Sequence, residues 1–166
     1  MVVAAAVSPD ARLLATGGWD EAVTLWSVET RKPIRVLFGH KGEIHALAFS
    51  PDGRLLASSG AYRWEYLDGE DGSTLRRNGP CAIRGDGTGS LQFYAADDNQ
   101  TDTTVKVWEV ESGENIATLE HQQIATEIVF SPDGSRIATA SGNQVNMWCT
   151  ETWKAVKHWI RLRLNL

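Results

Sequence analysis

Three residue types that can perform acyl-transfer chemistry occur around the middle of this chain. His40, Ser58 and Asp102 are the general base, the nucleophile and the orienting acid of a hydrolase triad, provided that the fold brings them together. No glycine-flanked serine on a strand-to-helix turn accompanies them, and neither does an oxyanion-hole motif. The residue types therefore fit hydrolysis, while the surrounding sequence does not. Whether the three residues form a catalytic triad depends on the strands and loops that position them.

Two glycine-rich stretches offer other chemistry. Residues 68–73 could supply oxygen ligands to calcium, but they lack the full loop spacing and the closing glutamate. Residues 85–90 have the glycines of a phosphate-binding loop without its lysine or its strand-to-helix context. We interpret both as solvated loops. Since the four histidines show no paired spacing and the two cysteines form no cluster, we expect no metal site and no cofactor.

The composition excludes several classes of protein. The chain has 166 residues, of which 42% are hydrophobic and 22% charged, and its formal net charge is −5. This acidic balance argues against a surface that binds nucleic acid through phosphate contacts. No apolar run approaches the roughly 20 residues needed to cross a bilayer, and the first residues lack the basic start of a signal peptide. We expect a cytoplasmic protein that contacts neither nucleic acid nor membrane.

A repeated segment organises the chain. Residues 50–60 read Ser-Pro-Asp-Gly-Arg-Leu-Leu-Ala-Ser-Ser-Gly, and close copies begin at Ser8 and Ser131. Proline presets the second turn position, aspartate hydrogen-bonds back to the main chain, and glycine relaxes the exit before an apolar run. Each copy therefore predicts a turn followed by a strand. The second gap is about twice as long as the first, which indicates an insertion or a decayed copy.

A tryptophan that ends the next predicted strand locates the extra residues. Thr16 lies ten residues before Trp26, whereas Ser58 is separated from Trp108 by a much longer stretch. Deleting residues 61–100 on paper brings Ser58 to ten residues before Trp108 and restores an unbroken repeat. We therefore predict that this block is inserted into one hairpin, whose two strands still pair.

These features resemble the WD-repeat family, in which each repeat of roughly 40 to 45 residues forms a four-stranded blade of a β-propeller. The resemblance implies an all-β fold, an incomplete β-propeller of three four-stranded antiparallel blades with a long inserted loop. It also implies a hydrogen-bonded structural tetrad of His, Ser or Thr, Asp and Trp in each blade. The matching residues are His40, Ser58, Asp102 and Trp108 in the second repeat; Thr16, Asp20 and Trp26 in the first; and His121, Thr139 and Trp148 in the third, with Asn143 nearest the aspartate position.

The repeats divide the single domain into three parts. We place repeat 1 at about 2–40, repeat 2 at about 41–121 and repeat 3 at about 122–162. The insertion is rich in glycine and carries no repeat motif, so we expect a long loop, poorly ordered or weakly hairpin-like, on one rim. The alternative is a decayed fourth blade, in which residues 91–95 form a strand.

The resemblance implies a non-catalytic scaffold that binds other proteins. Our candidate contact residues lie in the loops of one face: Trp19, Glu21, Lys41, Glu43, Gln122 and Gln123. Three blades cannot close a ring, since propellers use roughly four to eight. We therefore expect a fragment of a larger propeller, or a chain that associates with itself or with further blades. The alternatives are a hydrolase that uses the inserted loop and a defective reading frame without selected function.

Overall fold

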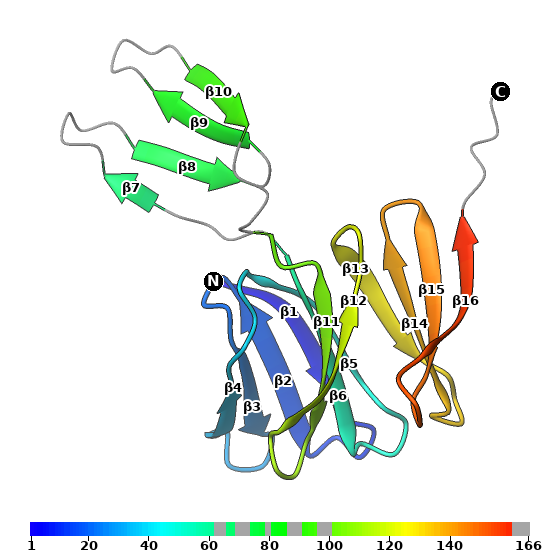
Figure 1. Ribbon diagram of the computed structural model, residues 1–166. Coiled ribbons are helices and arrows are strands. Elements are labelled where there is room, and N and C mark those ends of the chain that lie inside the picture. Colours follow the sequence, from blue (N-terminus) through cyan, green and yellow to red (C-terminus); the bar gives the residue numbers. More distant parts are fainter. Residues whose placement is uncertain (62–65, 69–73, 79–80, 86–90, 96–100, 161–166) are drawn as a thin grey trace, which may run out of the picture.

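The computed structural model describes residues 1–61 and 101–160, and between them the backbone of four short strands at 66–68, 74–78, 81–85 and 91–95. The described residues form strands joined by turns, with no helix among them (Figure 1). Each sheet is antiparallel. The predicted all-β class with four-stranded blades is therefore confirmed.

Three sheets correspond to the three predicted repeats. Blade 1 contains β1 (Val2–Val7), β2 (Leu13–Gly18), β3 (Val23–Ser27) and β4 (Pro33–Leu37). Blade 2 contains β5 (Ile44–Phe49), β6 (Leu55–Gly60), β11 (Thr104–Glu109) and β12 (Asn115–Glu120). Blade 3 contains β13 (Ala125–Phe130), β14 (Arg136–Ser141), β15 (Gln144–Cys149) and β16 (Ala155–Ile160). In each blade the strands are neighbours in chain order, apart from the interruption between β6 and β11.

The interruption in blade 2 leaves its pairing intact. Strands β6 and β11 are antiparallel neighbours, with Ser58 opposite Lys106 and Leu56 opposite Trp108. The amide of Asp102 donates to the carbonyl of Ala61 across 2.9 Å, so the two ends of the insertion lie side by side. The prediction that the two halves of this hairpin pair despite the insertion is confirmed.

The inserted residues contain more regular structure than the sequence analysis expects. Strands β7 (Tyr66–Asp68), β8 (Thr74–Asn78), β9 (Cys81–Gly85) and β10 (Leu91–Ala95) form their own four-stranded antiparallel sheet. Strand β10 coincides with the one that the decayed-blade alternative requires. The insertion is thus a fourth sheet rather than a plain loop. Its short runs of strand-forming residues lie between glycines and match no repeat motif, which explains why sequence reasoning favoured a loop.

The repeated Ser-Pro-Asp segments form three equivalent corners. In the central corner the Ser50 hydroxyl donates to Asp52 at 2.6 Å and accepts the amide of Leu55 at 2.9 Å. The Asp52 carboxylate also accepts the amide of Arg54, and these hydrogen bonds lower the pKa of its carboxyl group. Ser8 and Ser131 repeat the arrangement in the other two blades. Each corner therefore fixes how the first strand of a blade turns into the second.

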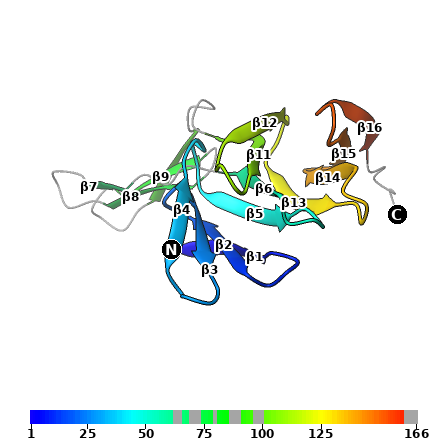
Figure 2. The same ribbon diagram turned by 90° about the horizontal axis from the view of Figure 1, so that it is seen from below.

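The core lies between the blades. Strand β5 contacts β1 on one side and β13 on the other, so the three first strands run side by side (Figure 2). The cluster between blades 1 and 2 contains Ala15, Val23, Leu25, Leu37, Ile44, Leu56 and Trp108. The cluster between blades 2 and 3 contains Ala57, Val105, Val107, Leu119, Ala125, Ile128, Phe130 and Ile137. Both faces of blade 2 are therefore covered, because large side chains of one sheet pack over small residues of the next.

Candidate functional site

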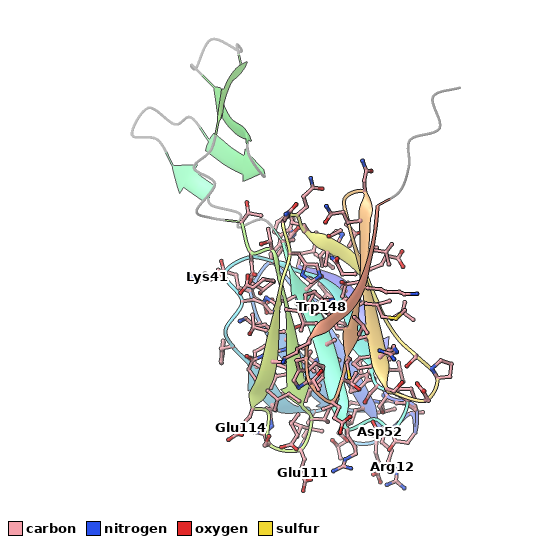
Figure 3. All side chains as sticks on the ribbon, turned by 45° about the vertical axis from the view of Figure 1, so that its right-hand side comes forward. Arg12, Lys41, Asp52, Glu111, Glu114 and Trp148 are labelled. Atoms are coloured by element: carbon pink, nitrogen blue, oxygen red, sulfur yellow. The ribbon has the colours of Figure 1, made fainter. Side chains whose placement is uncertain are left out.

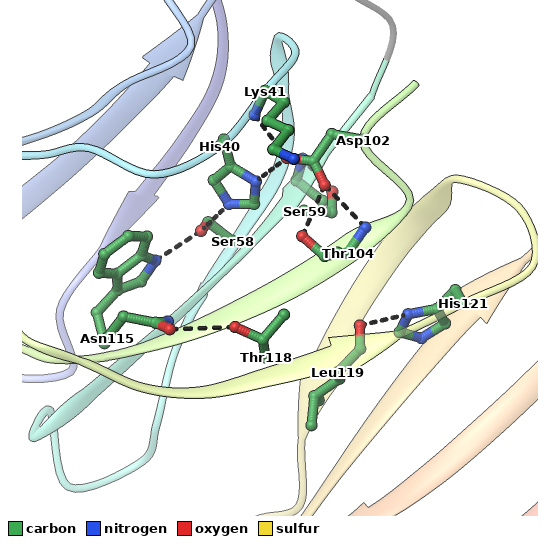
Figure 4. Close-up of polar contacts among 12 residues, drawn as sticks. His40, Lys41, Ser58, Ser59, Asp102, Thr104, Asn115, Thr118, Leu119 and His121 are labelled. Atoms are coloured by element: carbon green, nitrogen blue, oxygen red, sulfur yellow. Dashed lines mark hydrogen bonds and ion pairs between the residues drawn. The ribbon is translucent and has the colours of Figure 1, made fainter. Parts of the chain in front are cut away.

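Blade 2 brings together the four residues predicted for its tetrad, of which Figure 4 labels His40, Ser58 and Asp102. Trp108 Nε1 donates to Ser58 Oγ at 2.7 Å, and Ser58 Oγ lies 2.7 Å from His40 Nε2. His40 Nδ1 lies 2.7 Å from Asp102 Oδ2. Since tryptophan can only donate and a carboxylate can only accept, the hydrogen bonds run in one direction, from Trp108 through Ser58 and His40 to Asp102.

Asp102 is the most heavily hydrogen-bonded member of the set. Besides His40, it accepts the amide of Lys41 and both the amide and the hydroxyl of Thr104, at 2.9, 2.9 and 2.6 Å. Burial alone would raise the pKa of this carboxyl group, but the hydrogen bonds from His40 and Thr104 outweigh it and hold the pKa far below its usual value. Gly60 makes room for the carboxylate, since a Cβ at that position would overlap the Asp102 side chain. Asp102 therefore joins the loop before β5 to the hairpin of β6 and β11.

The same three residues have the order of a hydrolase triad but not its accessibility. Ser58 is fully buried, and the side chains of His40 and Asp102 are 1% and 3% exposed. The Ser58 hydroxyl is also occupied by the Trp108 indole. A nucleophile must reach a substrate carbonyl next to oxyanion donors, and the buried Ser58 hydroxyl offers no such position. The arrangement can serve as a structural clamp, which is the role that the sequence resemblance implies.

Blade 1 forms only part of the set. Trp26 Nε1 donates to Thr16 Oγ1 at 2.8 Å, as at the equivalent pair in blade 2. Asp20, however, is exposed in the turn between β2 and β3. No histidine stands before Thr16 in this sequence, so blade 1 has no residue in the place of His40 to link Thr16 to Asp20. The structure thus joins Thr16 to Trp26 and leaves Asp20 outside.

Blade 3 forms three of the four positions and satisfies its histidine differently. His121 Nε2 lies 2.7 Å from Thr139 Oγ1, which also accepts Trp148 Nε1 at 3.2 Å. His121 Nδ1 donates to the carbonyl of Leu119 at 3.0 Å, because the hairpin supplies no aspartate. Asn143, the sequence's nearest substitute, is exposed.

A buried serine marks the place where blade 3 departs from blade 2. Ser141 occupies the position of Gly60, where blade 2 has room for the Asp102 carboxylate. Ser141 is 2% exposed, and its hydroxyl has no hydrogen-bond partner among the described residues. The substitution of serine for glycine at the end of a second strand is the signal in the sequence that could have shown that this blade does without its aspartate.

The different surroundings of His121 predict a pH-dependent blade 3. Burial lowers the pKa of His121 below its ordinary value of about 6.5. As the pH falls, His121 is therefore protonated in the unfolded chain before it is protonated in the folded chain. The stabilisation that neutral His121 gives to blade 3 is fully present above pH 6.5 and declines as the pH falls below that value. Amide hydrogen exchange in β14 and β15 at pH 7.5 and 5.5 measures the effect. His121→Gln should remove the part of the decline that this residue causes, and an unchanged decline would contradict the assignment.

Two other kinds of site can be looked for in the part of the chain that the structure describes. Among the described residues no group of three or more His, Cys, Asp or Glu side chains is placed to hold a metal ion. Within the same part of the chain no helix is long and apolar enough to cross a membrane. The side chains of the two glycine-rich stretches, 68–73 and 85–90, lie outside the described residues.

The predicted contact residues lie in loops at one end of the blades. The loops between β2 and β3, β4 and β5, and β12 and β13 all follow strands that run toward that end, from which Lys41 projects in Figure 3. We call these three loops the upper rim. Lys41, Gln122 and Gln123 are exposed, and Trp19 and Glu21 are half-buried. Glu43 is only 9% exposed, so its side chain offers little surface to a partner, contrary to the expectation.

Comparison with known proteins gives relatives that are longer than this chain. It is 30% identical over 148 residues to the nuclear distribution protein nudF of Aspergillus terreus, covering 86% of this chain and 28% of the relative. It is 28% identical over 145 residues to the small ribosomal subunit protein RACK1y of Oryza sativa, and 28% identical over 159 residues to a guanine nucleotide-binding protein subunit beta of Zea mays. These matches cover 87% and 84% of this chain, and 31% and 42% of the relatives.

Solved structures show the same fold. The RRP9 WD40 repeats superpose with a TM-score of 0.68 at 17% identity, covering 96% of this chain and 38% of theirs. The WD40 domain of Toxoplasma gondii coronin gives a TM-score of 0.65 at 19% identity, covering 95% and 33%. The family model described as WD domain, G-beta repeat, matches residues 2–27, 31–73 and 113–149, more than half of the chain. With its three corners, its strand-end tryptophans and the tetrad of blade 2, the chain belongs to the WD40 repeat family.

Proposed function

We propose that this chain is a non-catalytic scaffold that binds other proteins through its upper rim. The observation that carries the proposal is the separation of two sets of residues in the fold. Ser58, His40 and Asp102, whose residue types could perform catalysis, are buried and hydrogen-bonded to one another. The exposed polar residues Lys41 and Gln122 stand on loops that a rigid sheet supports. Loops held by a rigid framework are common binding surfaces.

The relatives support an assembly role. Two of them are named as a ribosomal subunit protein and as a subunit of a guanine nucleotide-binding protein, both parts of larger complexes. This chain spans less than half the length of either relative, and we therefore extend their role in assemblies to this chain only as a proposal. The acidic net charge and the cysteine content support a partner that is a protein, in the cytoplasm.

Charge changes on the upper rim test the proposal. Lys41→Glu combined with Gln122→Arg should reduce the recovery of cross-linked protein partners at least about tenfold, because rim charges set the rate and specificity of encounter. The matched control is Arg12→Glu combined with Glu114→Lys, which changes the opposite end of the blades (Figure 3). Thermal unfolding must show that both variants fold. Equal recovery from the two variants would contradict a role for the upper rim.

A further inference from the structure

Each blade has two unlike faces. We call the face that carries the strand-end tryptophan the leading face and the opposite one the trailing face. The leading face of blade 2, with Leu56 and Trp108, packs on the trailing face of blade 1. The leading face of blade 3, with Ile137 and Trp148, packs on the trailing face of blade 2. The chain therefore contains the same leading-on-trailing junction twice.

The two outer faces are the two halves of a third such junction. On the leading face of blade 1, Val2 and Val7 are 64% and 58% exposed, and Val2 is the counterpart of Ile44, which is buried between blades 1 and 2. On the trailing face of blade 3, Val129 and Val145 are 57% and 40% exposed. Phe130, the counterpart of Val7 in blade 3, is 9% exposed beneath blade 2. Apolar side chains grouped on a sheet face mark an interaction surface.

The side chains on the two outer faces differ in size from those at the equivalent positions of the internal junctions, and the two differences compensate each other. At the internal junctions small residues meet large ones: Ala4, with Ala6 two residues further along the same strand, meets Leu47 and Phe49, and Ala46 and Ala48 meet Ile128 and Phe130. At the outer faces the trailing alanines are replaced by Glu127 and Val129, and the leading large pair is replaced by Ala5 and Val7. The number of side-chain heavy atoms across the four positions is nearly the same in all three cases. Sheets pack best when their combined volume is conserved.

The leading face of blade 1 also keeps a receiving hollow. A cavity of about 260 Å³ is lined by Leu14, Trp26, Ser27, Val28 and Arg31. The equivalent place on blade 2 receives Arg35 from blade 1, which lies against Gly113 and donates to the carbonyl of Glu111 at 3.0 Å. The hollow lies at the counterpart of this position, but Arg31 stands where blade 2 has Gly113, so it offers less room than the place that Arg35 fills.

The corners repeat the same relation. Pro9 of blade 1 lies against Gly53 of blade 2, and Pro51 of blade 2 lies against Gly134 of blade 3, with room for a Cβ at either glycine. In blade 1 the position of these glycines is occupied by Ala11, which has the same left-handed backbone, with a φ of 58°. A proline in the place of Pro9 would thus fit against Ala11. Pro132 of blade 3 is the proline that a second copy of the chain would bring there.

We propose that the trailing face of blade 3 in one copy packs on the leading face of blade 1 in a second copy. The junction is head to tail, and two of them close a ring of six blades, which lies within the roughly four to eight that propellers use. Glu127, Arg136 and Lys157 are the charged residues among those of the trailing face that the structure describes, and all three are exposed. The inference is independent of the upper rim, because it concerns the flat faces of the outer blades.

Charge on either outer face tests the proposal. Light scattering after size exclusion should give twice the chain mass for the unchanged chain at tens of micromolar. Val7→Glu and Val129→Glu should each raise the dissociation constant at least about tenfold, since a carboxylate would be buried in each of the two junctions. The control is Ile116→Glu, because Ile116 is 41% exposed but belongs to blade 2, and this variant should remain a dimer. Thermal unfolding must show that all variants fold.

Mixing the two variants distinguishes a head-to-tail dimer from a dimer that pairs identical faces. A Val7→Glu chain still has an unchanged blade 3, and a Val129→Glu chain still has an unchanged blade 1. Their mixture should therefore recover a dimer with one intact junction, although neither variant dimerises alone. An unchanged chain that is monomeric at 100 μM would overturn the proposal and indicate that blades from another chain cover these faces. Loss of the dimer with only one of the two variants would overturn the head-to-tail arrangement in favour of pairing between identical faces.

Discussion

Asp102→Ala is expected to lower the free energy of unfolding by about 3 kcal/mol at pH 7, because it leaves buried donors without their charged acceptor. His40, Lys41 and Thr104 all donate to this carboxylate. The matched control is Asp20→Ala, which removes the exposed aspartate at the equivalent position of blade 1 and should change stability by less than about 0.5 kcal/mol. Urea unfolding followed by tryptophan fluorescence measures both. Equal changes in the free energy of unfolding for the two variants would show that the buried hydrogen bonds of Asp102 do not stabilise the fold.

The contribution of Asp102 should also depend on pH with a definite sign. Its pKa is depressed in the folded chain, so the unfolded chain binds this proton first as the pH falls. The stabilisation is complete above the unfolded value of about 3.9 and is lost as the pH falls below it. The difference between the unchanged chain and Asp102→Ala should therefore be constant from pH 8 to about pH 5 and narrow toward pH 3. A difference that is the same at pH 3 and pH 7 would contradict the assignment.

Leu56→Ala is expected to cost about 3 kcal/mol, while the same change at Leu14 costs about 1 kcal/mol or less in the monomer. The two leucines occupy the same position of the repeated segment. Leu56 is fully buried between blades 1 and 2, whereas Leu14 lies on the uncovered leading face of blade 1. Unfolding measured at low chain concentration isolates the monomer. Equal costs would mean that blade 1 does not cover Leu56 as described.

The sequence was sufficient for the blades because their signals are local and repeated. A proline and an aspartate at fixed offsets, followed by glycine in two of the three copies, indicate a corner, and a tryptophan nine or ten residues beyond a serine or threonine, once residues 61–100 are set aside, indicates the hairpin that follows. That regularity allowed the pairing of Ser58 with the strand of Trp108 to be predicted across the insertion, as β6 and β11 show. It does not extend to the insertion, where a strand at residues 91–95 is expected only under the alternative of a decayed fourth blade.

What the sequence could not predict depends on contacts between distant residues. Nothing near Glu43 in the chain indicates that this loop residue is buried. His121 looks like His40 in sequence, but its Nδ1 donates to the carbonyl of Leu119 in β12, because the hairpin of blade 3 supplies no aspartate. The sheet of the insertion is not predictable in the same way, because strands without a repeat motif resemble a loop when only composition is considered. Burial and hydrogen-bond choice, unlike strand order, are decided by tertiary packing.

The hydrogen bond between Ala61 and Asp102 has a consequence for engineering. Because the two ends of the inserted sheet are already held next to each other, the intervening segment can be exchanged without stretching the hairpin. The entropy of closing such a loop grows only slowly with its length. The chain thus carries a ready-made grafting point, at which a peptide or a small domain with neighbouring termini could be displayed while the surrounding blade retains its register.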